Sequence, residues 1–387
     1  MSDRQYLLLV LGFLALTECL FWVRRGGVVF RQMATRRWRA VVRSEAISNH
    51  HGDLHWCWPF PPAGSVYIAR SWPFVAGPEG IATVPVECLH PSGHSGTASV
   101  FFAWAAVRDV AADGKVLRIN GQPLFRSDSP YEPLHFEALL RDLSRLPARD
   151  RPTRLREYLR QSFDRPMLRV RRANFSEQAA NWGTACTGLW IFLMIACPVV
   201  LWRFGWLPAL WWLVPALLLQ LAWITAGFIR LHRRFFPAAN DERFKLALVY
   251  ALAPVSATRA PDSLSRPLLG SFHPLCVAAE LLSSEALEPL AERIWRDLRF
   301  PRPVTMDLRT PQVAAEEAWF RSEIKSRVED LLREVNVNWA LWERPPMPSD
   351  PTHSGYCPRC LSQFTEEAKT CADCGGHPLF SMVRPIR

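Results

Sequence analysis

Four cysteines near the end of the chain have the spacing of a metal-binding site. Cys357 and Cys360 form one Cys-x-x-Cys pair, and Cys371 and Cys374 form a second pair after ten intervening residues. Each pair fits a tight turn whose sulfurs point at one ion, and two such turns complete a tetrahedral thiolate cage. Four thiolates fill the coordination shell and leave no position for water. The pattern therefore predicts a structural zinc ion, not a hydrolytic one.

The stretch around these cysteines resembles the zinc-ribbon domains found at the ends of many prokaryotic proteins. The resemblance covers residues 356–380 and rests on the four cysteines and the Cys-x-x-Cys-Gly form of the second pair. In the first pair, Leu361 stands where these domains usually have glycine, which predicts a slightly different exit from that turn. His377 is a further possible ligand, although four thiolates already suffice. Free or disulfide-bonded cysteines are the alternative to a metal site.

A second cluster of possible ligands lies at residues 50–62, which read HHGDLHWCWPFPP. Imidazole and thiolate groups bind zinc or copper, and the spacing of His51 and His55 would suit one face of a helix. The glycine at position 52 and the following Trp-x-Trp-Pro favour a loop or a strand instead, where that spacing has no such meaning. We interpret this cluster as structural, and the sequence does not determine its role. Its members are His50, His51, His55 and Cys57.

No local motif for catalysis occurs in the sequence. We find no phosphate-binding glycine loop, no G-x-S-x-G turn and no zincin motif. The sequence therefore identifies no small-molecule substrate, no catalytic residue and no cofactor other than zinc.

Three long apolar segments predict a membrane protein. They cover residues 6–23, 182–202 and 206–229, and the last two contain no charged side chain. At about 1.5 Å per helical residue, each can cross a hydrocarbon core of roughly 30 Å, the first only just. The first segment could instead be a cleaved signal peptide. We favour an uncleaved anchor because one arginine precedes it and no small-x-small cleavage site follows it.

Most of the excess positive charge lies in three arginine clusters beside these segments. The formal net charge is +10, and residues 24–43 contain seven arginines and no acid. Residues 151–182 contain eight arginines and three acids, and residues 230–234 contain three arginines. Arginines at membrane edges face anionic lipid. The lipid bilayer is therefore the expected partner of this charge, and no nucleic acid is expected.

These clusters also predict how the chain crosses the membrane. Short segments rich in Lys and Arg stay on the cytoplasmic side. The first cluster follows the span 6–23, and the spans 182–202 and 206–229 have arginines on their outer flanks. We therefore expect a multi-pass protein of the bacterial cytoplasmic (inner) membrane, with the N-terminus outside and the bulk of the chain in the cytoplasm. A reducing cytoplasm would keep the four cysteines as thiols, ready for metal.

Residues 45–165 predict a cytoplasmic α+β domain. Asp-Gly at 113–114 and Asn-Gly at 120–121 flank the run KVLRI and predict a hairpin or meander. Residues 135–146 place apolar side chains on one face, as an amphipathic helix does, and a second helix is expected over 154–163. The expected strands of this domain are 65–70, 81–89 and 99–110.

Residues 240–343 predict a cytoplasmic helical domain. The segment 244–252 is apolar but too short to span a membrane, so we expect a core or interfacial helix. Thr310 before Pro311 predicts the start of a long helix, whose apolar stripe is a packing face. The linker 344–355 is rich in proline and therefore semi-extended. Two further helices are expected over 273–283 and 284–299.

The predicted fold class is a multi-span α-helical membrane protein. It has three transmembrane helices, a basic juxtamembrane segment at 24–44, an α+β domain, a helical domain and a small C-terminal zinc ribbon. The function that we favour is an adaptor or assembly role, in which the ribbon, tethered by its linker, docks a protein partner. A membrane-bound enzyme with its site in residues 45–165 is the alternative. A membrane-tethered nucleic-acid binder is a weaker one.

Overall fold

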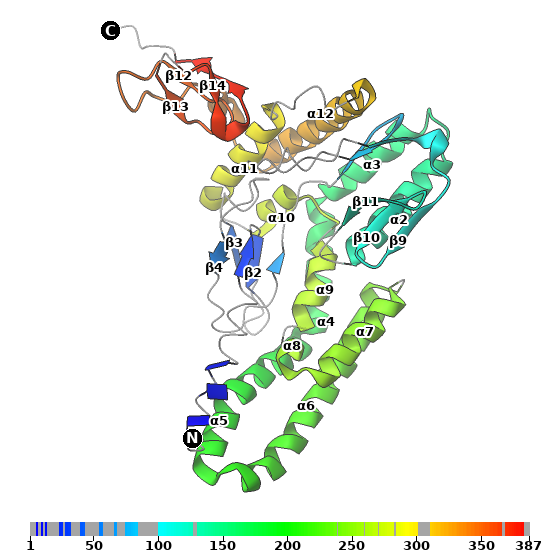
Figure 1. The fold of residues 1–387 in the computed structure, drawn as a ribbon, viewed down its shortest axis with the longest axis vertical. Coiled ribbons are helices and arrows are strands. Elements are labelled where there is room, and N and C mark those ends of the chain that lie inside the picture. The colour runs from blue at the N-terminus through cyan, green and yellow to red at the C-terminus, as the bar shows by residue number, and fades with distance from the viewer. Residues whose placement is uncertain are drawn as a thin grey trace. The chain divides into compact units, whose positions relative to one another are not determined.

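Figure 1 shows a computed structural model of the chain, which is mostly helical and has small antiparallel sheets. The chain divides into two compact units, which we describe separately. Unit 1 comprises Met1–Val41, Asp53–Ile68 and Pro166–Ser271, and unit 2 comprises Val42–Gly52, Ala69–Arg165 and Phe272–Arg387. The structure describes residues 5–6, 9–10, 12–13, 23–25, 28–31, 39–42, 54–56, 66–67, 74–83, 100–126, 130–237, 239–258, 260–269, 271–281, 284–300, 310–365 and 368–382.

The N-terminal part of the chain forms short antiparallel strands. β1 pairs with β4, and a second sheet has the order β3-β2-β5. Most of the predicted first span, 6–23, lies outside the described residues. The strands are β1 (Val23–Arg25), β2 (Val28–Arg31), β3 (Arg39–Val42), β4 (Leu54–Trp56) and β5 (Val66–Tyr67).

Unit 1 contains two helices that are long and apolar enough to cross a membrane, Arg165–Phe204 and Trp206–Phe235. The first is built from α4 (Arg165–Ile191), the π-helix η4 (Phe192–Ala196) and α5 (Cys197–Phe204), and the second is α6 (Trp206–Phe235). Pro198 lacks a backbone N–H, and the preceding Cys197 N–H bonds to the carbonyl of Phe192. The π-helix thus takes up the irregularity that this proline introduces. Gly205, with φ of 78°, joins the two helices in a tight turn, as the sequence predicts.

The two long helices pack through a narrow stripe of apolar side chains. Trp182 donates its Nε1–H to the carbonyl of Ile224 at 2.9 Å. Gly227 leaves room for that indole, since a Cβ at this position would lie 2.4 Å from Trp182 Cδ1. Spacings that alternate between three and four residues are those of left-handed helix pairs. The buried stripes are Phe175, Ala179, Trp182, Cys186 and Leu189 on α4, and Leu221, Ile224, Phe228 and Leu231 on α6.

Three shorter helices pack against the same core. They are α7 (Asn240–Leu252), α8 (Pro254–Ala257) and α9 (Ala260–Leu269), and they bury Ala247, Tyr250, Ala257, Ala260, Leu264 and Leu268 there. Arg171 of α4 donates to the carbonyl of Leu268 at 3.4 Å and to Ser271 Oγ at 2.7 Å. The expected helix over 244–252 is therefore present, and it starts four residues earlier. Residues 240–271 belong to unit 1, whereas 272–343 belong to unit 2.

Residues 74–126 of unit 2 form two three-stranded antiparallel sheets. The meander predicted from the Asp-Gly and Asn-Gly turns is confirmed as β9-β10-β11, and Gly114 and Gly121 both have positive φ. The expected strand 99–110 is wrong in its length, because the chain leaves β8 for the 3₁₀-helix η3 (Trp104–Ala106). There the Trp104 indole donates to the carbonyl of Gly77 at 2.8 Å. The strands are β6 (Phe74–Ala76), β7 (Gly80–Thr83), β8 (Phe101–Ala103), β9 (Val110–Asp113), β10 (Val116–Ile119) and β11 (Gln122–Arg126).

The helices of unit 2 bury the faces that their sequences predict. α2 packs Phe136, Leu139, Leu140 and Leu143 onto the sheets. α12 starts at Pro311, and Thr310 Oγ1 accepts the Val313 N–H at 3.3 Å. The apolar stripe of α12 is buried, which confirms a packing face. The helices are α2 (Tyr131–Arg145), α3 (Arg151–Ser162), α10 (Pro274–Leu281), α11 (Ser284–Arg299), α12 (Pro311–Glu334) and the 3₁₀-helix η6 (Trp339–Glu343).

Candidate metal centre

The four cysteines lie together at the ends of two short hairpins. One sheet has the strand order β13-β12-β16, and a second pairs β14 with β15. The first Cys-x-x-Cys pair follows β12, and the second begins at the end of β14 and passes through a 3₁₀ turn. The elements are β12 (Gly355–Tyr356), β13 (Gln363–Phe364), β14 (Thr370–Cys371), η7 (Ala372–Cys374), β15 (His377–Pro378) and β16 (Phe380–Ser381).

The sulfur positions fit one tetrahedral metal ion. The Sγ atoms of Cys357, Cys360, Cys371 and Cys374 all lie within 4.8 Å of one another. Zinc–sulfur bonds of about 2.3 Å in a tetrahedron place the sulfurs about 3.8 Å apart. The Sγ atoms of Cys360 and Cys371 are 3.7 Å apart. The cluster can therefore hold a metal ion such as zinc with thiolates alone, which leaves no coordination position for a substrate.

The two turns leave the site with the same backbone conformation. Gly375, after the second pair, has φ of 72°, and Leu361, at the matching position after the first pair, has φ of 64°. The expectation of a different exit is therefore wrong for φ. The hydrogen bonds do differ, because Leu361 N–H reaches the carbonyl of Cys357 at 2.8 Å, whereas Gly376 N–H reaches that of Cys371 at 2.9 Å. Leucine in the left-handed region costs about 1 kcal/mol, which the surrounding contacts must offset.

When no metal is bound, the close packing of the four thiols shifts their pKa values in different directions. The pKa of Cys360 is lowered because the thiols of Cys357 and Cys374 donate hydrogen bonds to its sulfur. Burial raises the pKa of the Cys371 thiol to about 11. The hydrogen bond that the Cys374 thiol makes with Cys357 raises the pKa of Cys374. A bound divalent cation would release these protons, so metal affinity should rise with pH.

His377 is not part of the group of residues that can hold the metal ion. Its Nδ1 atom lies 2.9 Å from the carbonyl oxygen of Pro378, and its ring packs edge-on against Phe300 with centroids 6.1 Å apart. Among the described residues, the group that can hold a metal consists of the four cysteines. His377 is buried and packs the ribbon against the end of α11.

A buried arginine ties the ribbon to α11. Arg296 is 5% exposed and donates to the carbonyls of Pro358 and Trp342 at 2.9 and 2.8 Å. Its Nε also donates to Glu292 Oε1 at 2.9 Å. One turn of the ribbon is paired as well, since Arg359 lies 2.8 Å from Asp297. The ribbon therefore packs against a helix of its own chain.

These attachment residues were missed by sequence reasoning. Arg296 and Asp297 belong to a helix with charges along most of its length, and nothing in their spacing distinguishes them from solvent-exposed residues. Pro358 and Arg359 lie between two of the metal ligands, a position that indicates a tight turn and not a contact with a helix. The signal that could have found the contact was the charge pair Asp297 and Arg359, but it joins positions 62 residues apart.

Most of the second cluster of possible ligands lies outside the residues that the structure describes. His50, His51 and Cys57 lie outside them. His55 lies in strand β4, opposite Arg24 of β1. A strand at this position fits the interpretation of 50–62 as a loop or strand.

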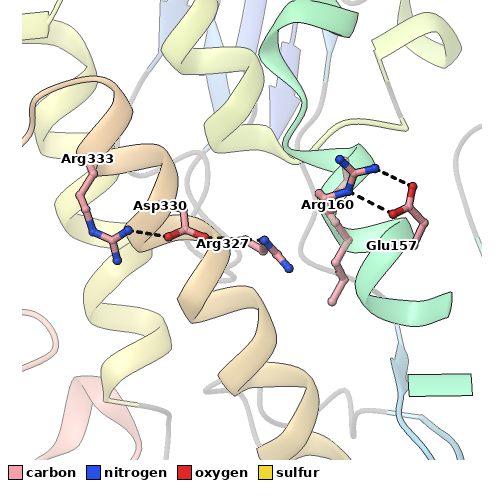
Figure 2. A network of polar contacts seen from close by, with 7 residues as sticks. Glu157, Arg160, Arg327, Asp330 and Arg333 are labelled. Carbon is pink, nitrogen blue, oxygen red and sulfur yellow. Dashed lines mark hydrogen bonds and ion pairs between the residues drawn. The ribbon is translucent and has the colours of Figure 1, made fainter. Parts of the chain in front are cut away.

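Several arginines of the cluster 151–182 make ion pairs within unit 2. Arg156 lies 2.9 Å from Glu323, and Arg165 lies 2.9 Å from Glu334, so both join neighbouring helices to α12. Figure 2 shows Arg160 paired with Glu157 on α3, and Asp330 between Arg327 and Arg333 on α12. Arg154 pairs with Asp142 at 2.7 Å. The arginines of 151–165 named here therefore have acidic partners within the chain.

A comparison of the chain with protein-family models, with curated proteins and with solved structures finds no match.

Proposed function

We propose that this chain is an integral membrane protein whose cytoplasmic part, with a structural zinc ribbon, has an adaptor or assembly role. The observation that carries the proposal is the combination of a closed four-thiol metal site with two long apolar helices. A closed site stabilises a fold and presents a surface, whereas a catalytic zinc keeps a position for water. The enzyme alternative has no comparable support among the described residues.

The membrane part of the proposal rests on the exposure of the long helices. In the most apolar windows of these helices only 11% and 17% of the residues are buried. Trp211 and Trp212 of α6 are 81% and 80% exposed. A core helix of a soluble protein would bury such side chains, because exposed apolar patches of this size are rare on monomers. Lipid acyl chains would cover them.

The proposed topology places the N-terminus outside and the bulk of the chain in the cytoplasm of a bacterium. It rests on the arginines that flank the apolar spans of the long helices, with Arg169 and Arg172 before the span 182–202 and Arg233 and Arg234 after the span 206–229. A reporter fused after Arg387 tests it. Green fluorescent protein should be fluorescent there, and alkaline phosphatase should be inactive. Active phosphatase at that position would refute the topology.

The adaptor role needs a part of the ribbon that remains accessible. Arg359 faces α11, but Lys369, Thr370, Ala372 and Asp373 on the second hairpin are exposed. This rim carries both charge signs and surrounds the turn that holds the second pair of cysteines. We propose the rim as the surface that contacts a protein partner.

Affinity capture of the full chain in mild detergent tests the adaptor role. The variant Lys369→Glu with Asp373→Lys reverses two exposed charges without touching the thiols or the contacts to α11. It should keep one zinc ion per chain and lose a partner that the unaltered chain captures. Arg149→Glu is the matched control, because the Arg149 side chain is 86% exposed and lies elsewhere in unit 2. An unchanged set of partners in the double variant would refute the role of the rim.

A further inference from the structure

The outer face of α7 is apolar. Phe244 and Leu252 are 73% and 74% exposed, and Leu248 between them is half exposed. Steps of four residues place these three side chains in one stripe. On the opposite face, Ala247 and Tyr250 are buried in the core that α7 shares with α6. The helix is therefore apolar on both faces, although one of them is open.

Charge is confined to the first part of this segment. Residues 241–245 contain Asp241, Glu242, Arg243 and Lys245, whereas 246–258 contain no charged residue. A helix at a water interface would carry polar residues along its whole outer face. The charge distribution instead indicates that the first turn of this segment lies in water and that the rest lies in an apolar medium.

The apolar end of α7 lies beside the apolar part of α6. The ring of Tyr250 packs against Phe228 with centroids 4.9 Å apart, and Phe228 falls inside the predicted span 206–229. Figure 1 shows α7 running back alongside α6. The next element, α8, buries Ala257 in the same core. The turn between α7 and α8 is therefore at the level of the membrane-spanning segment, not beyond it.

Several polar groups of this turn are hydrogen-bonded within it, as an apolar medium requires. Ala253 N–H reaches the carbonyl of Val249 at 2.8 Å, and Ala257 N–H reaches that of Ala253 at 3.0 Å. Pro254 has no N–H to satisfy. Thr258 Oγ1 donates to the carbonyl of Val255 at 2.7 Å. The turn can therefore enter lipid without stranding these groups.

We infer that residues 240–258 form a re-entrant element that enters the cytoplasmic leaflet and returns, with Phe244, Leu248 and Leu252 inserted among lipid acyl chains. The inference rests on the membrane-spanning part of the proposed function. Lipid is the occupant because the open face of α7 adjoins the exposed apolar surface of α6. Amphipathic segments of this kind insert about 5–10 Å below the headgroups.

Photo-crosslinking from single sites tests this element in the full chain. The photoreactive residue p-benzoylphenylalanine replaces Leu248 or Leu252, and the protein is irradiated in nanodiscs of phosphatidylethanolamine and phosphatidylglycerol. Both positions should form adducts with the mass of one phospholipid. Tyr250, on the buried face of the same helix, is the matched control, and its adduct yield should be at least fivefold lower. Leu219, which is 74% exposed on α6, reports on the span itself.

The outcomes separate the two proposals. Lipid adducts from position 219 but none from 248 and 252 would overturn the re-entrant element and leave the span intact. No lipid adducts from any position, 219 included, would overturn the span and the element together. Crosslinks from 248 or 252 to a second copy of this chain would also overturn the inference, because a protein would then cover the stripe.

Discussion

Replacing Arg296 with methionine should loosen the ribbon from α11 without emptying the metal site. Methionine keeps much of the apolar stem but removes every donor of the guanidinium. The carbonyls of Pro358 and Trp342, at 2.9 and 2.8 Å from that group, then lose a charged donor in a buried site. The thiols are untouched, so one zinc ion per chain should remain bound.

The magnitude follows from those contacts. Hydrogen bonds to charged groups contribute about 1.5–3 kcal/mol each, and breaking a buried charged contact costs about 3–5 kcal/mol in total. Arg296 is 5% exposed, so solvent screening reduces this cost only slightly. Arg299, one turn later on α11, is the control, since its side chain is 46% exposed and lies 3.9 Å from Glu343. Arg299→Met should cost about 0–1 kcal/mol.

Hydrogen exchange of the full chain in detergent measures the difference. A loss of about 3 kcal/mol corresponds to a roughly 100-fold rise in the exchange rate of amides protected by ribbon docking. The Cys357 N–H, which bonds to the carbonyl of Ser362, lies in the turn whose Pro358 carbonyl Arg296 holds, so peptides over this turn report the change. Equal exchange in the Arg296 and Arg299 variants would refute the claim that this arginine holds the ribbon.

Three further predictions concern the metal, the helix pair and pH. Cys374→Ser should lower bound zinc from one ion per chain to a small fraction, as measured by atomic emission after dialysis; undiminished zinc would contradict a four-thiolate site. Gly227→Ala should destabilise the chain by about 1–3 kcal/mol in thermal unfolding, because the new Cβ would lie 2.4 Å from Trp182. Gly188→Ala, with nothing within 4 Å, should be close to neutral, and equal losses would contradict the packing. Burial lowers the pKa of His273 to about 3. Between about pH 6.5 and 3, the unfolded chain therefore binds a proton at His273 that the folded chain does not bind. The free energy of unfolding should fall over this range as the pH is lowered, by up to about 1.4 kcal/mol per pH unit. A His273→Asn variant with the same slope would contradict this origin of the pH dependence.

The local patterns of the sequence predicted much of the secondary structure. Thr310 before Pro311 begins α12, and Gly114 and Gly121 turn the β9-β10-β11 meander, because these signals depend on backbone preferences within a few residues. The prediction of a strand over 99–110 is wrong in its length because the end of that strand depends on a contact that is distant in the sequence. Trp104 leaves the strand for a hydrogen bond with Gly77, and a partner 27 residues away in sequence leaves no periodic pattern.

The sequence by itself identified the four thiols of the metal site and the two long apolar segments. Cysteine spacing within 357–374 is enough to bring four sulfurs together, since each pair closes over four residues, and an uncharged run of more than twenty residues is a local property. Only the tertiary structure decided what these parts contact. Arg296 and Asp297 bind the ribbon, three arginines of 151–165 bind acids on other helices, and the apolar stripe of α7 is exposed. Each of these contacts depends on which side chain, distant in the sequence, the fold places next to it. The charge or hydrophobicity of a residue alone does not specify that partner.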